Sequence, residues 1–263
     1  MERRAISKAA IVFEAVSKRF GKTGSPAVDN ISLSIGEGEF ITILGSSGCG
    51  KTTLLKMVNR LHEPDSGSIH LFGENTRDVD VIKVRRRIGY VIQQVGLFPH
   101  MTVAKNVAIV PELMKWDRQR TLARVGELLS LVGLDPEVFG ARYPRQLSGG
   151  QQQRVGLARA LAIDPKIMLL DEPFGAVDAI TRGNLQNELL RLHNGLKKTF
   201  LLVTHDIAEA FTLGDRVVVM NEGRVCQFDT PEAIIDKPAD DFVASLIHSA
   251  RRRKRIWEGL EHD

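Results

Sequence analysis

Hydrophobic and polar residues alternate in the first part of the chain with the two-residue period of short strands. Ile11–Val16 and Ile31–Ile35 show this alternation, and a Gly/Lys/Ser/Pro turn region separates them. Glu39–Leu44 is a third predicted strand, which leads into a glycine-rich loop and then a helical pattern over Thr52–Arg60. Two further strands are predicted at Ser68–Phe72 and Ile88–Ile92.

The middle of the chain has the periodicity of helices. From about Val103 to Leu161 apolar residues recur every three or four positions. One apolar face is predicted to consist of Leu122, Val125, Leu128, Leu129 and Val132. We expect this all-helical block to form an inserted subdomain.

Strands and helices alternate again in the last third of the chain. Ile167–Leu170 and Thr199–Val203 are predicted buried strands, with an amphipathic helix over Arg182–Leu196 between them. The alternation predicts an α/β fold with a mainly parallel sheet covered on both faces. Asn221-Glu222-Gly223 is an expected hairpin turn. Its flanking strands and the final helices are predicted at Arg216–Met220, Arg224–Phe228, Pro231–Ile235 and Asp240–Ser249.

The composition is that of an ordinary globular protein. The 263 residues include 43% hydrophobic and 26% charged residues, and the formal charge is +4. Most of this excess can come from the run Arg251-Arg252-Arg253-Lys254-Arg255, so the charge alone does not indicate a face that binds nucleic acid. The two cysteines, Cys49 and Cys226, form no CxxC pair, which fits a reducing cytoplasm.

The hydrophobic stretches predict a soluble chain. None approaches the roughly 18–20 apolar residues that a helix needs to span a bilayer. The start, Met1-Glu2-Arg3-Arg4, is not followed by the apolar core of a signal peptide. We therefore expect any membrane role to depend on a partner.

A glycine-rich loop carries the first chemical motif. It matches the pattern G-x-x-x-x-G-K-[ST] and lies between a predicted strand and a predicted helix, as a phosphate-binding loop requires. Its glycines let backbone N–H groups turn toward phosphate oxygens, and the helix adds its positive end. Lys51 can reach the β- and γ-phosphates, and the Thr52 hydroxyl can ligate Mg²⁺. The alternative is an ordinary glycine-rich turn. The phosphate loop is Gly45-Ser46-Ser47-Gly48-Cys49-Gly50-Lys51-Thr52.

Two carboxylates follow a hydrophobic strand. Asp171 is suited to hold Mg²⁺, and Glu172 is placed to polarise an attacking water. The alternative is a strand that ends in a solvated acidic turn. Beside a phosphate loop, the functional interpretation is favoured.

The segment Leu147-Ser148-Gly149-Gly150-Gln151 identifies a family. Ser148 is a good N-cap, and the glycine pair leaves backbone N–H groups unobstructed, so a capped helix start without a ligand is the alternative. With this pentapeptide the chain resembles the ATP-binding cassette (ABC) ATPases. The resemblance implies that the signature segment, Leu147–Gln151, closes over the γ-phosphate held by a second subunit.

Further positions agree with the family from about Val12 to Phe242. Phe20 stands where the family has an aromatic ring that stacks on adenine; an apolar residue at a strand end is the alternative. Gln93 corresponds to the glutamine that senses Mg²⁺ and water, although Gln94 leaves the register ambiguous. His205 matches the histidine that contacts the γ-phosphate. Gly175-Ala176-Val177-Asp178 matches the loop that crosses the dimer interface, with Asp178 at its acidic end.

The resemblance assigns three sets of site residues. The catalytic residues are Glu172, His205, Lys51 and Gln93, and the metal-ligating residues are Thr52, Gln93 and Asp171. The nucleotide set consists of Phe20, Gly45, Ser46, Ser47, Gly48, Cys49, Gly50, Lys51, Thr52, Thr53, Gln93, Ser148, Gly149, Gly150, Gln151, Asp171, Glu172, Asp178 and His205.

The resemblance also implies a domain organisation. A P-loop NTPase core over residues 1–92 and 163–250, with an N-terminal antiparallel β-subdomain, is interrupted by a helical signature subdomain over residues 93–162. Together these parts form a single ABC ATPase domain over residues 1–250, which a basic tail follows over residues 251–263.

Two classes of function are compatible with an ABC cassette. One is a transport ATPase; the other is a soluble ATPase that acts on nucleic acid or ribosomes. The DNA-repair relatives carry a long coiled coil between the phosphate loop and the signature, and the translation-factor type carries two cassettes. This chain has one cassette and no sustained heptads, so transport is favoured.

The segment Val91–Val103 resembles that of a bacterial importer. The segment Asp171–Arg182, together with Leu113–Trp116, is similar to the glycine betaine/carnitine/choline (osmoprotectant) importer ATPases. We therefore expect a homodimer with composite ATP sites, bound to transmembrane permease subunits on the cytoplasmic face of the cell membrane. A solute-binding protein would take part indirectly, and the cofactors would be ATP and Mg²⁺.

Many members of that subfamily continue into tandem regulatory cystathionine-β-synthase domains. This sequence stops at Asp263, about twenty residues past Phe242. The expectation is that such a module does not regulate it.

Overall fold

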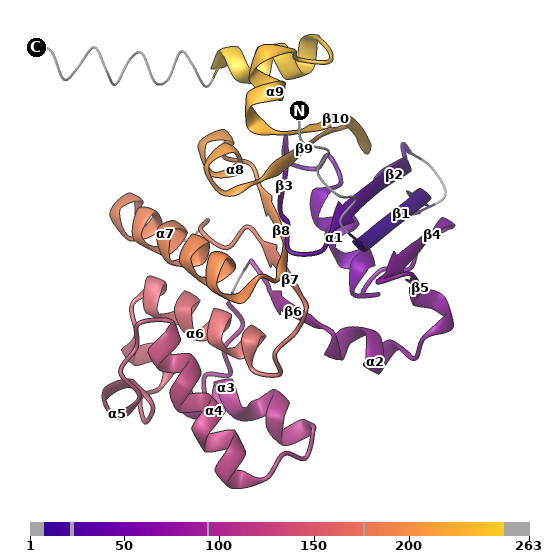
Figure 1. Cartoon of the computed structure of the whole chain (residues 1–263). Helices are drawn as coiled ribbons and strands as arrows, with labels where there is room; N and C mark the ends of the chain where they lie inside the picture. Colours follow the sequence, from indigo (N-terminus) through magenta and orange to yellow (C-terminus); the bar gives the residue numbers. More distant parts are fainter. Residues whose placement is uncertain (1–7, 22–23, 94, 176, 250–263) are drawn as a thin grey trace, which may run out of the picture. The chain divides into compact units, whose positions relative to one another are not determined.

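The computed structural model describes residues 8–21, 24–93, 95–175 and 177–249. They form two compact units: unit 1 lies within Met1–Val81 and Leu201–Asp263, and unit 2 within Ile82–Phe200. Each unit contains both strands and helices (Figure 1), which confirms the predicted α/β class. Gln94, Ala176 and the basic tail over residues 251–263 lie outside the described residues.

One sheet of unit 1 is antiparallel, with the strand order β2-β1-β4-β5. On β1, Ile11 lies opposite Ile35 of β2 and Leu71 of β4, and all three side chains are buried. The N-terminal antiparallel β-subdomain is therefore confirmed. Its strands are β1 (Ala9–Lys18), β2 (Val28–Gly36), β4 (Ser66–Leu71) and β5 (Glu74–Asn75).

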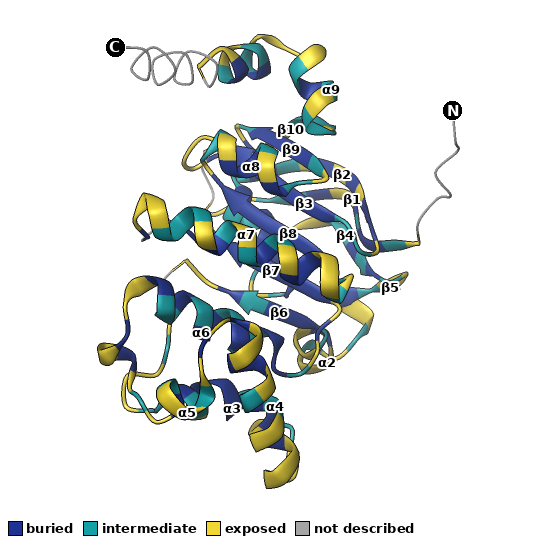
Figure 2. Cartoon of the chain, turned by 60° about the vertical axis from the view of Figure 1, so that its left-hand side comes forward, coloured by how far each residue is buried: buried dark blue, intermediate teal, exposed yellow. Residues whose placement is uncertain are grey.

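Within unit 1, the strands of the second sheet follow the order β10-β9-β3-β8, and β8 begins at the unit boundary. β3 is parallel to β9, and β10 returns antiparallel to β9. Every residue of β3 and β8 is buried, and Figure 2 shows both strands in the buried colour. A strand covered on both faces has a continuous apolar sequence, which is why these runs could be predicted. The strands are β3 (Phe40–Gly45), β8 (Thr199–Thr204), β9 (Arg216–Asn221) and β10 (Arg224–Asp229).

The helices of unit 1 end at local backbone signals. The predicted helix Thr52–Arg60 is observed as α1 (Lys51–Val58), because Arg60 adopts a left-handed conformation, with φ 55°, and the Leu61 N–H bonds to the Lys56 carbonyl at 2.9 Å. The other helical elements are η1 (Thr76–Asp78), α8 (Ile207–Leu213), α9 (Pro231–Asp236) and a helix over residues 241–249.

Unit 2 combines a parallel strand pair with helices. β6 (Ile88–Val91) and β7 (Ile167–Asp171) are parallel, with Val91 opposite Leu170. Among the described residues, no helix has both the length and the apolar character that crossing a bilayer requires. The helices are α2 (Val81–Arg86), which begins at the unit boundary, α3 (Val103–Leu113), α4 (Arg118–Leu131), α5 (Pro136–Phe139), α6 (Gly149–Leu161), α7 (Ala179–Leu196) and the short η2 (Pro144–Gln146).

One residue of the predicted apolar face was assigned wrongly. Leu122 is 59% exposed, whereas Val125 and Leu128 are buried. Thr121 takes the inward position one turn before Val125, and its hydroxyl is satisfied by donating to the Asp117 carbonyl at 2.9 Å. Because its hydroxyl is hydrogen-bonded locally, the polar residue Thr121 can be buried at this position, where a pattern based on hydrophobicity alone predicts leucine.

The compact units do not coincide with the predicted subdomains. β6 and β7 belong to unit 2 together with the helical block. The predicted division, with a core over residues 1–92 and 163–250 and a helical part over residues 93–162, stays a prediction.

The two faces of α4 should differ in their tolerance of substitution. Leu128→Ala should lower the free energy of unfolding by about 2–5 kcal/mol, because it leaves a cavity in the core. Leu122→Ser should change it by less than about 0.5 kcal/mol, because the side chain already faces water. Urea unfolding of both variants measures the difference. A large loss for Leu122→Ser would contradict the observed orientation of α4.

Candidate functional site

The phosphate loop of unit 1 has a backbone that side chains would not permit. Gly48 and Gly50 have φ angles of 80° and 103°. A Cβ on Gly50 would lie 2.0 Å from the Ala27 carbonyl oxygen, and one on Gly45 would lie 2.3 Å from the Met220 carbonyl oxygen. Glycine is therefore required both for the backbone conformation and for the close approach of neighbouring segments.

Lys51 folds over this loop. Its side chain is 5% exposed, and Nζ donates to the carbonyl oxygens of Gly45, at 2.9 Å, and Ser46, at 2.8 Å. Lys51 also begins α1, whose N-cap, Gly50, supplies no side-chain hydrogen bond. Thr52 and Thr53 follow in the first turn of α1. A cation and a helix N-terminus thus meet at one place, which suits an anion.

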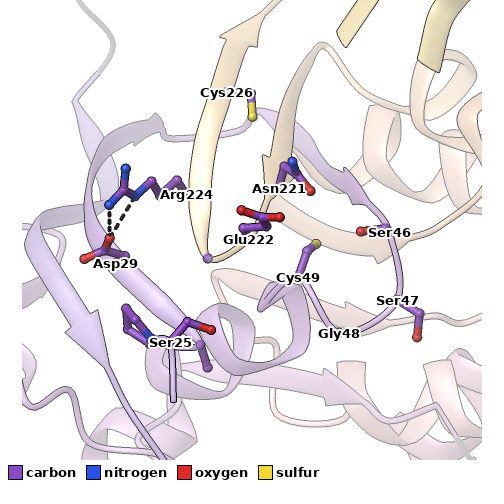
Figure 3. A pocket seen from close by; sticks show the side chains of 13 residues that line it. Ser25, Asp29, Ser46, Ser47, Gly48, Cys49, Asn221, Glu222, Arg224 and Cys226 are labelled. Atoms are coloured by element: carbon purple, nitrogen blue, oxygen red, sulfur yellow. Dashed lines mark hydrogen bonds and ion pairs between the residues drawn. The ribbon is translucent and has the colours of Figure 1, made fainter. Parts of the chain in front are cut away.

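A cavity of about 940 Å³ adjoins the loop (Figure 3). Ser46, Ser47, Gly48 and Cys49 line one side of it. The sequence analysis did not predict its remaining wall, which consists of Ser25, Pro26, Ala27, Asp29, Asn221, Glu222, Gly223, Arg224 and Cys226.

The hairpin between β9 and β10 is fixed against the phosphate loop. The Gly223 N–H donates to the Cys49 carbonyl at 3.1 Å, and the Asp29 N–H donates to the Gly223 carbonyl at 2.8 Å. An ion pair between Arg224 and Asp29, at 2.7 Å, closes the same wall. The hairpin turn itself was predicted and is confirmed, with Glu222 at φ 45° and Gly223 at φ 81°. Its place beside the loop depends on tertiary contacts, which no local pattern reports.

Phe20 follows β1 in unit 1, and its side chain is half exposed. The His62 ring packs against it at 5.2 Å between centroids and 74° between planes, and Lys18 Nζ lies 5.7 Å from its centroid. Asp65 accepts from Lys18 Nζ at 2.8 Å and from the Arg19 N–H at 2.7 Å, and these contacts lower the pKa of Asp65. The segment that carries the ring is therefore tied to the chain that follows α1. Phe20 is not among the residues that line the 940 Å³ cavity.

His205 follows β8 in unit 1 and is exposed. The Thr204 hydroxyl before it donates to Glu209 at 2.6 Å, and Asp206 after it caps α8 by accepting from the Ala208 N–H at 2.8 Å. Both chain neighbours of His205 are thereby fixed. β8 lies beside β3, the strand that leads into the phosphate loop.

Unit 2 brings three predicted residues together at the ends of its strands. Asp171 ends β7 and is buried, and Glu172 follows it. Gln93, two residues after β6, donates from Nε2 to Glu172 Oε2 at 3.1 Å. Glu172 has φ 45°, a left-handed conformation that is strained for this residue type and is common at functional sites.

Tyr90 is a neighbour of this group that the sequence analysis missed. Its hydroxyl donates to Asp171 Oδ2 at 3.3 Å. Burial, followed by the Asp171 charge, raises the pKa of Tyr90 well above its usual range. The available signal was a tyrosine within the apolar strand β6. A tyrosine hydroxyl in such a strand needs a hydrogen-bond partner, which indicates a polar neighbour.

The signature segment begins α6 with a capping box. The Gln151 N–H donates to Ser148 Oγ at 3.3 Å, and Gln151 Oε1 accepts from the Ser148 N–H at 2.9 Å. A Cβ on Gly150 would lie 2.5 Å from the Thr181 side chain, so the second glycine also permits close packing of α6 on α7. Gly149 remains exposed at the start of the helix.

Asp178 caps α7. It accepts from the Thr181 N–H at 3.0 Å, and this backbone hydrogen bond is the main cause of its lowered pKa. The cap explains why α7 begins at Ala179, three residues before the predicted start at Arg182. Gly175, Val177 and Asp178 of the expected interface loop are described, and Ala176 lies outside the described residues.

The predicted site residues thus fall into two groups. Unit 1 holds the phosphate loop, Thr53, Phe20 and His205. Unit 2 holds Gln93, Asp171, Glu172, the signature segment and Asp178. Within unit 2, contacts join Gln93 directly to Glu172 and Tyr90 to Asp171.

The chain is similar to transport ATPase subunits. A family model described as ABC transporter matches residues 28–175. The osmoprotectant import ATP-binding protein OsmV of Salmonella typhimurium is 51% identical over 249 residues, covering 94% of this chain and 65% of the relative. The choline transport ATP-binding protein OpuBA of Bacillus subtilis is 52% identical over 241 residues, covering 92% of this chain and 63% of the relative. The chain thus spans less than two thirds of the length of either relative.

A solved structure has the same fold. It is the dimeric, post-hydrolysis state of the ATP-binding cassette MJ0796 bound to ADP and Pi. Its sequence is 36% identical, the TM-score is 0.75, and the match covers 84% of this chain and 98% of that one.

Cys49 offers a chemical test of the site. Its thiol lines the cavity, and its Sγ lies 3.8 Å from Lys51 Nζ, so a maleimide attached there would place bulk within the phosphate loop. We expect the reagent to abolish ATP hydrolysis and Mg-ATP to protect against it. Cys49→Ser should keep its activity and lose the sensitivity.

Cys226 provides the matched control for this experiment. It lines the same cavity outside the phosphate loop, and burial, followed by Asp240, raises the pKa of its thiol, so a smaller fraction is thiolate than in an ordinary cysteine. Cys226→Ser should remain as sensitive as the unmodified protein. Full activity after mass spectrometry shows complete labelling of Cys49 would contradict the assignment.

Proposed function

The chain belongs to the ABC transporter family, and on that premise we propose that it binds and hydrolyses Mg-ATP as the nucleotide-binding subunit of an importer. The observation that carries the proposal is the phosphate loop. It follows a fully buried strand, has positive φ at Gly48 and Gly50, and holds a buried Lys51 ammonium against its own carbonyl oxygens. The Lys51 ammonium can then donate to phosphate oxygens in place of these carbonyl oxygens.

The residues present fit ATP and Mg²⁺. A Cβ on Gly48 would meet nothing within 4 Å, so there is open space over the loop for phosphates. The Thr52 hydroxyl and the Asp171 carboxylate are oxygen donors, which Mg²⁺ prefers. When bound by them, Mg²⁺ would neutralise charge on the phosphate oxygens.

The remaining chemistry belongs to side chains of this chain. Lys51 binds the β- and γ-phosphates and offsets the charge that develops during transfer. Glu172 accepts a proton from the attacking water, and Gln93, which contacts Glu172 at 3.1 Å, orients the carboxylate and the water. His205 donates to the γ-phosphate. Phosphoryl transfer requires mainly this positioning and charge neutralisation.

The conformation of Glu172 supports its role as the base. A left-handed φ costs a non-glycine residue of the order of 1–3 kcal/mol and persists only where its surroundings enforce it. Here the buried β7 fixes the preceding residue, Asp171, and Gln93 holds the side chain. The contacts that enforce this strained conformation therefore hold the carboxylate at one place beside the end of the strand.

A head-to-tail homodimer completes each site in this proposal. The exposed N-terminus of α6 offers Ser148 and the backbone N–H groups of the glycine pair to a γ-phosphate held by the other subunit. Asp178 lies at the start of α7, which packs closely on α6 at Gly150 and Thr181. The dimeric state of the related MJ0796 cassette supports this arrangement.

A groove of about 430 Å³ in unit 2 is the proposed contact with a membrane subunit. Ile82, Leu113, Tyr90 and Arg85 are among the residues that line it. Leu113 is 71% exposed, and such an apolar side chain beside arginines fits an amphipathic helix of a permease. The subunit would then sit on the cytoplasmic face of the membrane through this contact.

Glu172→Gln should trap ATP between two subunits. The substitution removes the base, so hydrolysis should slow by about 10²–10⁴-fold while the phosphate contacts remain. ATP that is not hydrolysed binds the closed dimer better than the open monomers and shifts the population. The variant should elute from size exclusion as a dimer with ATP and as a monomer with ADP.

Ser148→Arg in the Glu172→Gln background is the control. It places bulk and charge where the γ-phosphate must dock, so the ATP-dependent dimer should disappear. A Glu172→Gln protein that binds ATP tightly yet stays monomeric at high concentration, also when the permease is present, would contradict the composite site.

The transported solute is proposed to be a quaternary ammonium osmoprotectant such as glycine betaine, carnitine or choline. The printed functions of the two relatives, osmoprotectant import and choline transport, support this class. Cation–π contacts for such a solute would lie in the solute-binding partner. Calorimetry on that purified partner should detect a quaternary ammonium ligand. Binding of only a sugar or sulfate would refute the solute and leave the ATPase proposal intact.

A further inference from the structure

Arg159 lies in the last turn of α6 and reaches across to a neighbouring segment. It donates from Nη2 to the Val95 carbonyl at 2.7 Å and from Nη1 to the Gly96 carbonyl at 2.8 Å. Burial lowers the pKa of its guanidinium. Hydrogen bonds from a charged donor in a partly buried place are among the stronger contacts in a protein.

The same segment is held by a second contact from α6. A Cβ on Gly156 would lie 2.6 Å from Val95 Cγ1, so only glycine lets the Val95 side chain pack this closely on the helix. Gly96 has φ 57°, a left-handed conformation that glycine adopts without strain. Residues 95 and 96 are thus fixed by packing as well as by hydrogen bonds.

This segment begins two residues after Gln93. Gln93 contacts Glu172, and along the chain it is separated from Val95 by one residue, Gln94, which lies outside the described residues, so displacement of Val95 would shift Gln93 through the covalent backbone. At the opposite end of α6, Ser148 and the glycine pair form the helix N-terminus. A helix of 13 residues is about 20 Å long, and Arg154 joins its middle to Glu188 of α7 at 3.1 Å.

We propose that Arg159 is a positioning residue that holds Gln93 against Glu172 and thereby makes the placement of the general base depend on α6. The inference rests on the proposed function, because it assumes that Glu172 acts on water. Arg159 touches no reacting atom. Its effect passes through two backbone carbonyls and one amide.

The chain offers a matched control in Arg124. This arginine also donates to two consecutive carbonyl oxygens, from Nη2 to Leu161 at 3.0 Å and from Nε to Ala162 at 3.2 Å. Both arginines therefore tie one segment of unit 2 to another. Arg124 holds the C-terminal end of α6 and, in the described hydrogen bonds, has no contact with the Val95–Gly96 segment, so its loss shows what loosening that end of the helix does while the Arg159 contacts remain.

The experiment compares Arg159→Met, Arg159→Lys and Arg124→Met in the full chain. Arg159→Met should lower kcat about 10–100-fold while KM for ATP changes less than about twofold, because misplacement of a catalytic group by about 1 Å has effects of this size. Arg159→Lys should restore kcat in part, because one ammonium can reach one carbonyl. Arg124→Met should keep kcat within about twofold.

Gln93→Ala identifies the route of the effect. If Arg159 acts through Gln93, Arg159→Met should lower kcat no further in the Gln93→Ala background. Hydrogen exchange of the peptide that covers residues 88–98 should be faster in Arg159→Met and unchanged in Arg124→Met, and this measurement does not depend on activity.

Three results would overturn the inference. The first is an equal loss of kcat from Arg159→Met in both backgrounds, and the second is an unchanged kcat in Arg159→Met. In either case the proposed function still holds if the unmodified protein hydrolyses ATP. The third is the absence of ATP hydrolysis by the unmodified protein, which would overturn the proposed function and this inference together.

Discussion

The conformation of the phosphate loop in unit 1 depends on one close contact between two backbone segments. The Gly50 Cα lies against the Ala27 carbonyl so closely that a Cβ would approach its oxygen to 2.0 Å. This contact, with the hydrogen bond from Gly223 to the Cys49 carbonyl, packs the phosphate loop between the segment before β2 and the hairpin after β9. The loop conformation is therefore fixed by contacts within the protein itself. A preshaped loop binds phosphate without the entropic cost of ordering itself.

In unit 2, side chains at the ends of helices help to place the predicted site residues. Asp171 ends the buried strand β7, Gln93 contacts Glu172, and Arg159 of α6 holds the carbonyl of Val95, two residues after Gln93. Helix caps at Ser148 and Asp178 set where α6 and α7 begin. In unit 2 the proposed catalytic residue Glu172 thus follows a buried strand, whereas the signature segment and Asp178 are placed by helix caps.

The sequence predicted those features that a local pattern can encode. Period-two alternation predicted β1 and β2, apolar runs predicted the buried strands β7 and β8, and the Asn-Glu-Gly turn predicted the hairpin, whereas the two-residue strand β5 was not predicted. The position of Leu122 was wrong because its neighbour Thr121 satisfies its hydroxyl locally and can be buried. The cavity wall at Asp29 and Arg224 and the contacts of Arg159 could not be predicted. They join residues far apart in the chain, and nothing in a single sequence records which distant carbonyl an arginine will reach.

Some side chains proposed to bind phosphate also form the N-terminal cap of α6, and this limits how they can bind phosphate. Ser148 Oγ accepts from the Gln151 N–H, but a hydroxyl also has one donor proton and a second lone pair. It can therefore cap α6 and donate to a phosphate oxygen at the same time. Gln151 Oε1 is engaged by the Ser148 N–H, so Gln151 supports the cap, and in the proposed site the phosphate contacts fall to the Ser148 hydroxyl and the backbone N–H groups of the glycine pair. Removal of the Ser148 hydroxyl would thus weaken the helix by about 1 kcal/mol as well as the phosphate contact. The stability of the isolated chain separates these two effects, because only the cap contributes to it.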